Sequence, residues 1–476
     1  MVFSSLLFIY LFLALNLFIY SRAHKITTRN VIMLIFSLIF YAWGGPKYLI
    51  LLVGMTFISW IMALAIDRYY DHRKKLIILT CVLELGLLGI FKYTGFVLGS
   101  LQAITGFPEV VPQIVLPIGI SFYTFQLLSY VIDVYRKEVE PQQKFWLLLL
   151  YASLFHQCIA GPIVRYQDVA HDISHRVIKI NEVDRGIKRF CIGLAKKAIL
   201  ANGCATIADT FLVIDDLSAL SNVSAMGLWL GVLCFMLQIY LDFSAYSDMA
   251  IGMGLMIGFH YKENFNYPYV ASSITDFWRR WHISLSTFFR DYVYIPLGGN
   301  RKGPRRTIIN LFVVWFLTGM WHGASWNYIL WGLYFFIFLV LEKNVLLERF
   351  KKLPKFVSHI YALVVIYFGW IIFKFEDLSG LGTVLKGMFG FNGNGFSDMQ
   401  TSLMFKNNVF FLIFAIIAVT PLFKNIRKRI IQWFKNRSAI PYPIYAYEII
   451  LPVALLILST MALVGNSYNP FLYFQF

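Results

Sequence analysis

The stretch YLILLVGMTFISWIMALAI occupies residues 48–66 and contains no charged residue. Similar apolar runs cover residues 2–20, 76–91 and 223–241. A helix needs about 20 apolar residues to cross the hydrocarbon core of a bilayer. Because that core offers the backbone no hydrogen-bonding partner, such runs are expected to be helical. The sequence therefore predicts an all-α, polytopic transmembrane protein.

Bulk composition supports the same fold class. Hydrophobic residues make up 59% of the chain and charged residues 14%, with a mean hydropathy of +0.66. A soluble domain has roughly 25% charged residues, so these 476 residues carry too few charges to cover a water-exposed surface. The five cysteines are scattered without a Cys-x-x-Cys pair, and they predict neither a disulfide framework nor a metal site.

The charge balance is basic, with 42 Lys and Arg against 25 Asp and Glu. In a soluble protein this excess would suggest a nucleic-acid partner. Here the basic residues lie in short segments between apolar runs, as the positive-inside rule expects of cytoplasmic loops. The charge pattern therefore predicts contact with membrane lipid and none with nucleic acid.

The same charges predict the orientation of the chain. Basic residues follow the first apolar run at 22–29, and a basic loop at 424–437 precedes the last run at 449–464. Because basic loops stay in the cytoplasm, both termini are expected to be extracytoplasmic, which requires an even number of crossings. We expect about 10 to 12 spanning helices in a single domain covering residues 1–476.

Two segments, 161–187 and 264–306, are too polar to span a bilayer. The first contains His171, His175 and Arg176, and it is expected at the cytoplasmic surface or the interface. The second is rich in both aromatic and charged residues. Polar chain at membrane depth is tolerated only where protein buries it or where it lines a wet cavity. The second segment is therefore a candidate functional site.

The first candidate residue in that segment is His282. The sequence SSITD at 272–276 supplies helix N-cap residues, and FWRRWHISLSTFFRD at 277–291 is predicted to continue as one helix. Trp278, Trp281 and His282 recur with later apolar residues at helical spacing, so one face carries two indoles and an imidazole. We therefore expect His282 to face the protein interior.

The second candidate is His322, at the end of the apolar run VVWFLTGMWHG at 313–323. Gly319 and Gly323 flank it in a small-x-x-x-small arrangement that lets another backbone approach closely, and Gly323 can end the helix. Burial disfavours the charged form of an imidazole, so His322 can keep a lone pair ready for a proton. About 40 residues separate the two histidines, and only the fold can bring them together.

Other interpretations of these residues remain. A single buried histidine is more often a hydrogen-bonded part of the core than a functional group. Two membrane histidines could also ligate a haem iron, although the usual four-helix arrangement with paired histidines is not visible. The basic group Arg301, Lys302, Arg305 and Arg306 could bind the phosphates of a nucleotide-bearing donor. The same four charges are also explained by topology alone.

The chain resembles the membrane-bound O-acyltransferase (MBOAT) family, in its bacterial alginate O-acetyltransferase-like branch. The most specific region is 264–326, with FNYPY, DFWRRWHISLS, FRDYVYIPLGGNR and WHG. Further matches are GISFYTFQ from residue 119, GPI from 161, LDFSAYSDMA from 241 and PFLYFQF from 470. These matches occur in order along most of the chain, which makes coincidence a poor explanation.

The resemblance implies a helical fold with a central funnel and places the family's catalytic histidines at His322 and His282. It implies that an acyl thioester, most often acetyl-CoA, acts as donor substrate, with no bound cofactor. The acceptor would be a hydroxyl of an exopolysaccharide such as alginate, or of a cell-wall glycan. A separate extracytoplasmic partner of the hydrolase-like SGNH type is expected to finish the transfer, and the location would be the bacterial inner membrane.

Our hypothesis is that His322 acts as general base on the acceptor hydroxyl. His282 would orient the acceptor or donate a hydrogen bond to the developing oxyanion. Within the same chemistry, the alternative is D-alanyl transfer from a carrier protein to teichoic acid. An alternative of another class is a proton-coupled transporter that uses the histidines as a relay, although no broken helices in corresponding halves support it.

Overall fold

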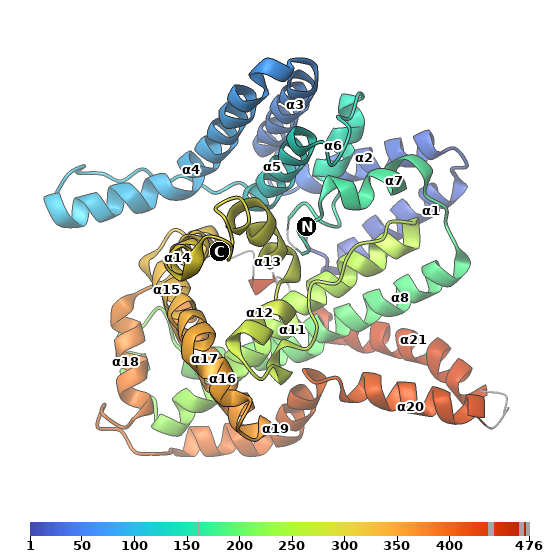
Figure 1. Cartoon of the computed structure of the whole chain (residues 1–476). Coiled ribbons are helices and arrows are strands. Elements are labelled where there is room, and N and C mark those ends of the chain that lie inside the picture. Colours follow the sequence, from blue (N-terminus) through green and yellow to red (C-terminus); the bar gives the residue numbers. More distant parts are fainter. Residues whose placement is uncertain (160, 437–441, 466–470, 473–476) are drawn as a thin grey trace. The chain divides into compact units, whose positions relative to one another are not determined.

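The computed structural model describes residues 1–476 apart from 160, 437–441, 466–470 and 473–476, and it folds into helices joined by turns (Figure 1). Within the described residues, eight helical segments are long and apolar enough to cross a membrane. They are Pro46–Arg68, Tyr70–Thr105, Ile180–Phe211, Ala225–Ile257, Trp326–Phe350, Lys355–Lys374, Met399–Ala418 and Ile444–Val464. Two shorter apolar helices, Phe8–Arg22 and Ile26–Ala42, precede them. The prediction of a polytopic all-α membrane protein is confirmed.

The described chain divides into two compact units. Unit 1 comprises Met1–Phe190, Tyr246–Glu263 and Leu463–Phe476, and unit 2 comprises Cys191–Ala245 and Asn264–Ala462. Whether the chain acts as a single domain stays a prediction. The elements of unit 1 are η1 (Phe8–Leu13), α1 (Ala14–Arg22), α2 (Ile26–Ala42), α3 (Pro46–Arg68), η2 (Tyr70–His72), α4 (Arg73–Thr105), α5 (Ile120–Arg136), α6 (Phe145–Ser153) and α7 (Tyr166–His175).

Three helices contribute residues to both units: α8 (Ile180–Ala195), α11 (Ala225–Ile257) and α21 (Tyr442–Val464). The remaining elements belong to unit 2. They are η3 (Lys196–Ala201), α9 (Asn202–Phe211), α10 (Leu217–Ser221), η4 (Pro268–Val270), α12 (Ile274–Arg280), α13 (Ile283–Phe289), η5 (Arg290–Tyr294), α14 (Gly303–His322), α15 (Trp326–Leu341), η6 (Glu342–Leu346), α16 (Leu347–Phe350), α17 (Lys355–Lys374), α18 (Leu378–Met388), α19 (Met399–Ala418) and α20 (Leu422–Asn436).

Two segments differ from the sequence-based expectation. Helix α11 continues beyond the apolar run at 223–241, because the carboxylate of Asp242 is paired with the Lys197 ammonium at 2.7 Å and both side chains are buried. Pairing offsets the cost of placing a charge in a membrane helix. The basic segment predicted as a loop is helix α20, since its apolar and basic residues alternate at helical spacing. Arg437 and most of the PFLYFQF ending lie outside the described residues.

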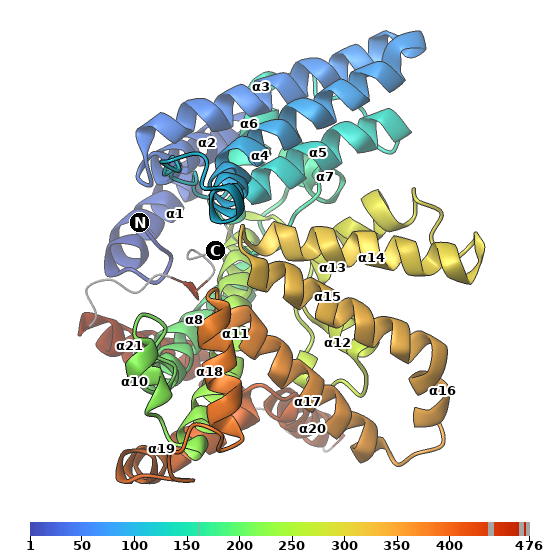
Figure 2. The ribbon, with the colours of Figure 1, turned by 90° about the vertical axis from the view of Figure 1, so that its left-hand side faces the viewer.

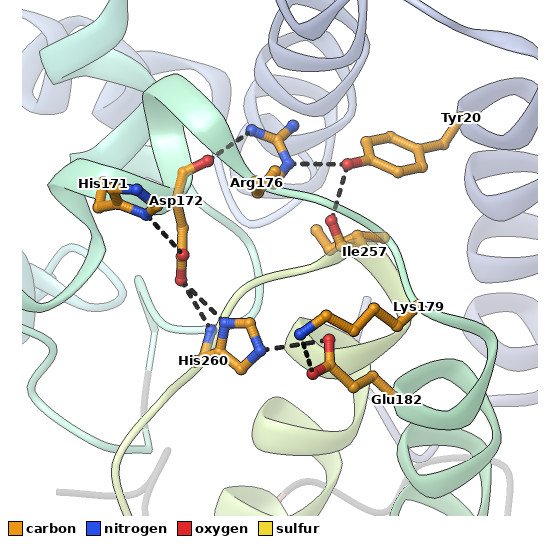
Figure 3. Close-up of polar contacts among 8 residues, drawn as sticks. All are labelled: Tyr20, His171, Asp172, Arg176, Lys179, Glu182, Ile257 and His260. Atoms are coloured by element: carbon orange, nitrogen blue, oxygen red, sulfur yellow. Dashed lines mark hydrogen bonds and ion pairs between the residues drawn. The ribbon is translucent and has the colours of Figure 1, made fainter.

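In unit 1, helix α3 packs against α2, α4, α5 and α6. Polar contacts join α7 and the residues around it to neighbouring elements (Figure 3). Arg176 donates from Nε to the hydroxyl of Tyr20 at 2.8 Å. The backbone N–H of His260 donates to the Asp172 carboxylate at 3.0 Å, and the His260 Nε2 lies 3.3 Å from Glu182. The polar stretch that precedes α8 is therefore used to connect elements of this unit.

In unit 2, helices α14 and α15 lie side by side (Figure 2). Glycines allow this approach. A Cβ added at Gly319 would lie 2.4 Å from the carbonyl oxygen of Tyr328, and one added at Gly332 would lie 2.4 Å from that of Trp315. The close approach expected from the small-residue spacing is therefore present, and α14 ends before Gly323 as predicted. Helix α15 also packs against α17, and α12 packs against both.

We predict that Gly319→Ala lowers the stability of the protein by about 1–3 kcal/mol, because the added methyl group meets a backbone oxygen that cannot move without separating α14 from α15. Thermal unfolding of the purified protein in detergent measures the change. Gly382→Ala in α18 is the matched control, since a Cβ added at that position would have nothing within 4 Å of it. Equal effects of the two substitutions would contradict this interpretation of the helix pair.

Candidate active site

The segment predicted as one helix around His282 is broken at that residue. Helix α12 ends at Arg280 and α13 begins at Ile283. His282 lies at the break with φ +43°, a left-handed conformation that residues other than glycine rarely adopt. The prediction of a continuous helix is therefore wrong. Tertiary hydrogen bonds replace the helical ones at this point, and helical spacing in the sequence carries no sign of them.

Asn264 supplies the hydrogen bonds at the break. Its backbone carbonyl accepts the N–H of Ile283 at 2.9 Å, and its side-chain oxygen accepts the N–H of Ser284 at 3.2 Å. The same side-chain oxygen accepts the Ser284 hydroxyl at 2.9 Å and lies 3.2 Å from Nδ1 of His282. Asn264 is fully buried. This one residue therefore fixes both the backbone at the break and the imidazole that the break presents.

The start of helix α12 is held from two sides. Ser273 caps it by accepting the N–H of Asp276 at 3.0 Å, as the sequence predicts. The carboxylate of Glu342, fully buried at the start of η6 directly after α15, accepts the backbone N–H groups of Ile274 and Thr275. A negative charge at a helix N-terminus is favourable, because the free N–H groups there carry partial positive charge. Helix α12 is thus anchored to the start of η6, which continues from α15.

His282 is 1% exposed and packs among aromatic rings. Its ring centre lies 4.8 Å from that of Phe243 in an edge-on contact and 5.8 Å from that of Trp321. Burial lowers the pKa of His282 to about 3, so the imidazole is neutral at physiological pH. Within the described residues its Nε2 makes no hydrogen bond. The burial predicted for this side chain is confirmed.

His322 is the last residue of α14 and is also buried. Its ring centre lies 5.0 Å from that of Trp321, 4.8 Å from that of Trp331 and 5.3 Å from that of Phe373. Both histidines therefore contact the same indole, that of Trp321. The fold brings together the two imidazoles that lie far apart in the sequence. Whether they are catalytic stays a prediction.

Both histidines line one cavity of about 470 Å³ in unit 2. Its buried lining includes both imidazoles and the indoles of Trp278, Trp281 and Trp315. The full set of lining residues comes from α12 to α16: Thr275, Trp278, Arg279, Trp281, His282, Leu285, Ser286, Phe289, Arg290, Tyr294, Asn300, Leu311, Val314, Trp315, Thr318, His322, Leu339, Lys343 and Leu347.

The cavity has a cationic, exposed side. Arg279, Arg290 and Lys343 line it and are exposed to solvent. Lys343 is positioned by Asn300, whose side-chain oxygen accepts its ammonium at 2.6 Å. Sequence reasoning missed these three cations as a group. Arg279 and Arg290 lie within the specific motif region, so the sequence could have suggested them. Lys343 lies at the end of another apolar run. The only signal there is the free-energy cost of placing a charged side chain in a membrane.

The four cations that the sequence offers as candidates for binding donor phosphates lie elsewhere. Arg301, Lys302, Arg305 and Arg306 are exposed, and none of them lines the cavity. They occupy the turn before α14 and its first residues. Their role in donor binding stays a prediction, and the cations of the cavity lining are a second possibility.

We predict that His282→Gly is more stable than His282→Ala by about 1 kcal/mol, because glycine adopts positive φ without the steric cost that alanine bears. Both variants lose the same imidazole, so the comparison isolates backbone strain. Thermal unfolding in detergent measures the difference. At Thr287, inside helix α13, the order of the glycine and alanine variants should be reversed. The same order at both positions would show that His282 is not strained.

Comparison with known proteins gives matches along the whole chain. The family model of the membrane-bound O-acyltransferases matches residues 36–382. A probable alginate O-acetylase of Pseudomonas putida is 36% identical over 100% of both chains. A peptidoglycan O-acetyltransferase of Helicobacter pylori is 32% identical over 100% of this chain and 98% of the relative. A teichoic acid D-alanyltransferase of Bacillus subtilis is 29% identical, over 55% of this chain and 68% of the relative.

Proposed function

We propose, from the premise that the chain belongs to the membrane-bound O-acyltransferase family, that it moves an acetyl group from acetyl-CoA to a hydroxyl of an extracytoplasmic polysaccharide. The family and the acyltransferase activity predicted from the sequence are confirmed. The protein is a multi-pass membrane enzyme. The proposal adds the donor, the acceptor and the residues that act on them.

The observation that carries the proposal is the division of one cavity into two chemical environments. Its buried part holds two imidazoles among indoles, and its exposed part holds three cations. A thioester of coenzyme A has the matching shape and charge, with an apolar acyl end and a phosphate-bearing end. The cations would bind the phosphates, and the thioester carbonyl would reach the imidazoles. This arrangement supports a donor that enters from the cationic side, and we propose that this side faces the cytoplasm.

The reaction needs a proton to leave the acceptor hydroxyl as the oxygen attacks the thioester carbon. His322 is our candidate for the general base, a role that typically contributes 10²–10⁴-fold to the rate. His282 would orient the acceptor or donate a hydrogen bond to the carbonyl oxygen as it becomes negative. The carbon–sulfur bond then breaks, and the thiolate takes up the proton. Direct transfer requires no acylated enzyme.

The names of the relatives support a polysaccharide acceptor. Relatives that match the whole chain include a probable alginate O-acetylase and a peptidoglycan O-acetyltransferase, whereas the D-alanyltransferase match covers about half of the chain. We therefore favour O-acetylation of an exopolysaccharide or cell-wall glycan over D-alanyl transfer. A hydrolase-like SGNH-type partner outside the inner membrane would receive the acetyl group or finish its transfer. Both chain termini are proposed to lie on that outer side.

We predict that His322→Ala and His282→Ala each lower acetyl transfer by about 10²-fold or more, because each removes a group that acts on the reacting atoms. The measurement follows radiolabelled acetyl-CoA in proteoliposomes that contain the purified protein and a soluble polysaccharide acceptor. His24→Ala, an exposed histidine between α1 and α2, is the control. Full activity in a folded His322→Ala protein would remove this mechanism.

The same assay separates the alternatives. Consumption of a D-alanyl carrier thioester in preference to acetyl-CoA would favour the teichoic-acid reaction. Flux of intact substrate without loss of thioester would favour a transporter. Either result would overturn the proposed acetyl transfer.

We predict that Arg279→Gln and Lys343→Gln each raise the KM for acetyl-CoA by roughly 10-fold with a smaller change in kcat, because an exposed charge-assisted contact to phosphate is lost in ground and transition states alike. Arg301→Gln and Lys302→Gln are matched controls outside the cavity lining. If the control substitutions raise KM and the cavity substitutions do not, the donor phosphates bind at the turn before α14 instead.

A further inference from the structure

The hydrogen bonds around Asn264 determine which of the two ring nitrogens of His282 carries the hydrogen. The backbone N–H of Ser284 points at one atom of the Asn264 side-chain amide, 3.2 Å away. A backbone N–H can only donate, so that amide atom must be the oxygen. The amide orientation therefore follows from the chemistry of its neighbour and needs no separate assignment.

The same oxygen lies 3.2 Å from Nδ1 of His282. A carbonyl oxygen can only accept, so Nδ1 must carry the hydrogen for this contact to be favourable. The Ser284 hydroxyl offers one competing arrangement, because it lies 3.4 Å from Nδ1 and could donate there. Its contact with the Asn264 oxygen is shorter, at 2.9 Å. If Nδ1 carried no hydrogen, its lone pair would face a lone pair of the Asn264 oxygen in a buried site, which is costly.

We propose that Asn264 is a positioning residue that holds His282 in the Nδ1–H tautomer, so that His282 meets the substrates only as a hydrogen-bond acceptor through Nε2. His282 lines the cavity and Asn264 does not. Because Nδ1 is engaged with Asn264, Nε2 is the ring nitrogen left for a molecule bound beside the ring. Nε2 is buried and makes no hydrogen bond within the described chain. A buried acceptor of this kind is satisfied when a donor enters the cavity.

This inference rests on the proposed acyl transfer and selects between the two roles left open for His282. A neutral imidazole with its hydrogen on Nδ1 cannot donate from Nε2 to an oxyanion. It can accept a hydrogen bond from the reacting hydroxyl or from a hydroxyl beside it, as a sugar offers. His282 therefore orients the acceptor, and the oxyanion must receive its hydrogen bonds from other groups.

The direct test is nitrogen NMR of the purified protein in lipid nanodiscs, with ¹⁵N-labelled histidine. The His282 signals are those missing from the His282→Gln protein. We expect the ¹⁵N chemical shifts typical of an imidazole with its hydrogen on Nδ1 (the Nδ1–H pattern) in the wild-type protein and in Ser284→Ala, because the serine hydroxyl is not the group that sets the tautomer. Asn264→Leu should lose that pattern. An Nε2–H pattern in the wild type, or an unchanged pattern in Asn264→Leu, would overturn the inference.

The pH dependence of kcat/KM provides a second readout in Asn264→Asp. The carboxylate can accept the same three hydrogen bonds, so this variant should keep the tautomer and remain active, whereas Asn264→Leu should lose about 10²-fold in rate. A negative charge beside Nδ1–H stabilises the imidazolium and raises the pKa of His282. Since the acceptor role needs a neutral Nε2, activity is lost as pH falls through that pKa. The acidic limb of the profile should therefore move to higher pH than in the wild type.

The two readouts separate this inference from the proposed function. If the wild-type protein shows no acetyl transfer, the proposed function fails, while the NMR spectrum still reports the tautomer. If transfer occurs and the acidic limb of Asn264→Asp coincides with that of the wild type, Asn264 does not act through His282 and the positioning role is wrong.

Discussion

The break between helices α12 and α13 must satisfy its own backbone N–H groups, and the rest of the site depends on how this is done. Where neither water nor a preceding helical turn supplies an acceptor, an unpaired N–H costs several kcal/mol. Asn264 supplies the acceptors for Ile283 and Ser284 from a point 19 or 20 residues earlier in the chain. The chain can therefore turn sharply at His282 and project an imidazole from a position that a regular helix would not offer.

A turn of this kind is a form of preorganisation. The left-handed backbone of His282 has a conformational cost, and such costs persist only where surrounding contacts hold the residue in place. Phe243 and Trp321 pack against the ring, Asn264 contacts Nδ1, and Glu342 fixes the start of the preceding helix. An imidazole held in this way need not reorganise when substrate arrives, which is the condition under which polar groups contribute most to a transition state.

The cavity combines this rigid, buried end with a cationic end open to solvent. Burial keeps the His282 imidazole neutral, whereas Arg and Lys side chains at the exposed end are suited to bind phosphate. Close packing of α14 on α15 brings His322 to the buried end, and the glycines at 319 and 332 permit that packing. Backbone contacts thus help to separate a buried, aromatic end of the cavity from an exposed, cationic end, as the proposed coenzyme A thioester donor would require.

The sequence by itself determined the membrane class, the all-α fold, the family, and the two histidines as candidates, because apolar run length and local motifs are properties of contiguous residues. It also indicated the close approach at Gly319 and the cap at Ser273. It did not indicate the break at His282, the ion pair of Lys197 with Asp242, or the grouping of Lys343 with Arg279 and Arg290. Each of these joins residues from separate elements, and helical periodicity records only which residues share a face of one helix. Which groups meet across helices, and which nitrogen of His282 contacts Asn264, was decided by tertiary hydrogen bonds and packing alone.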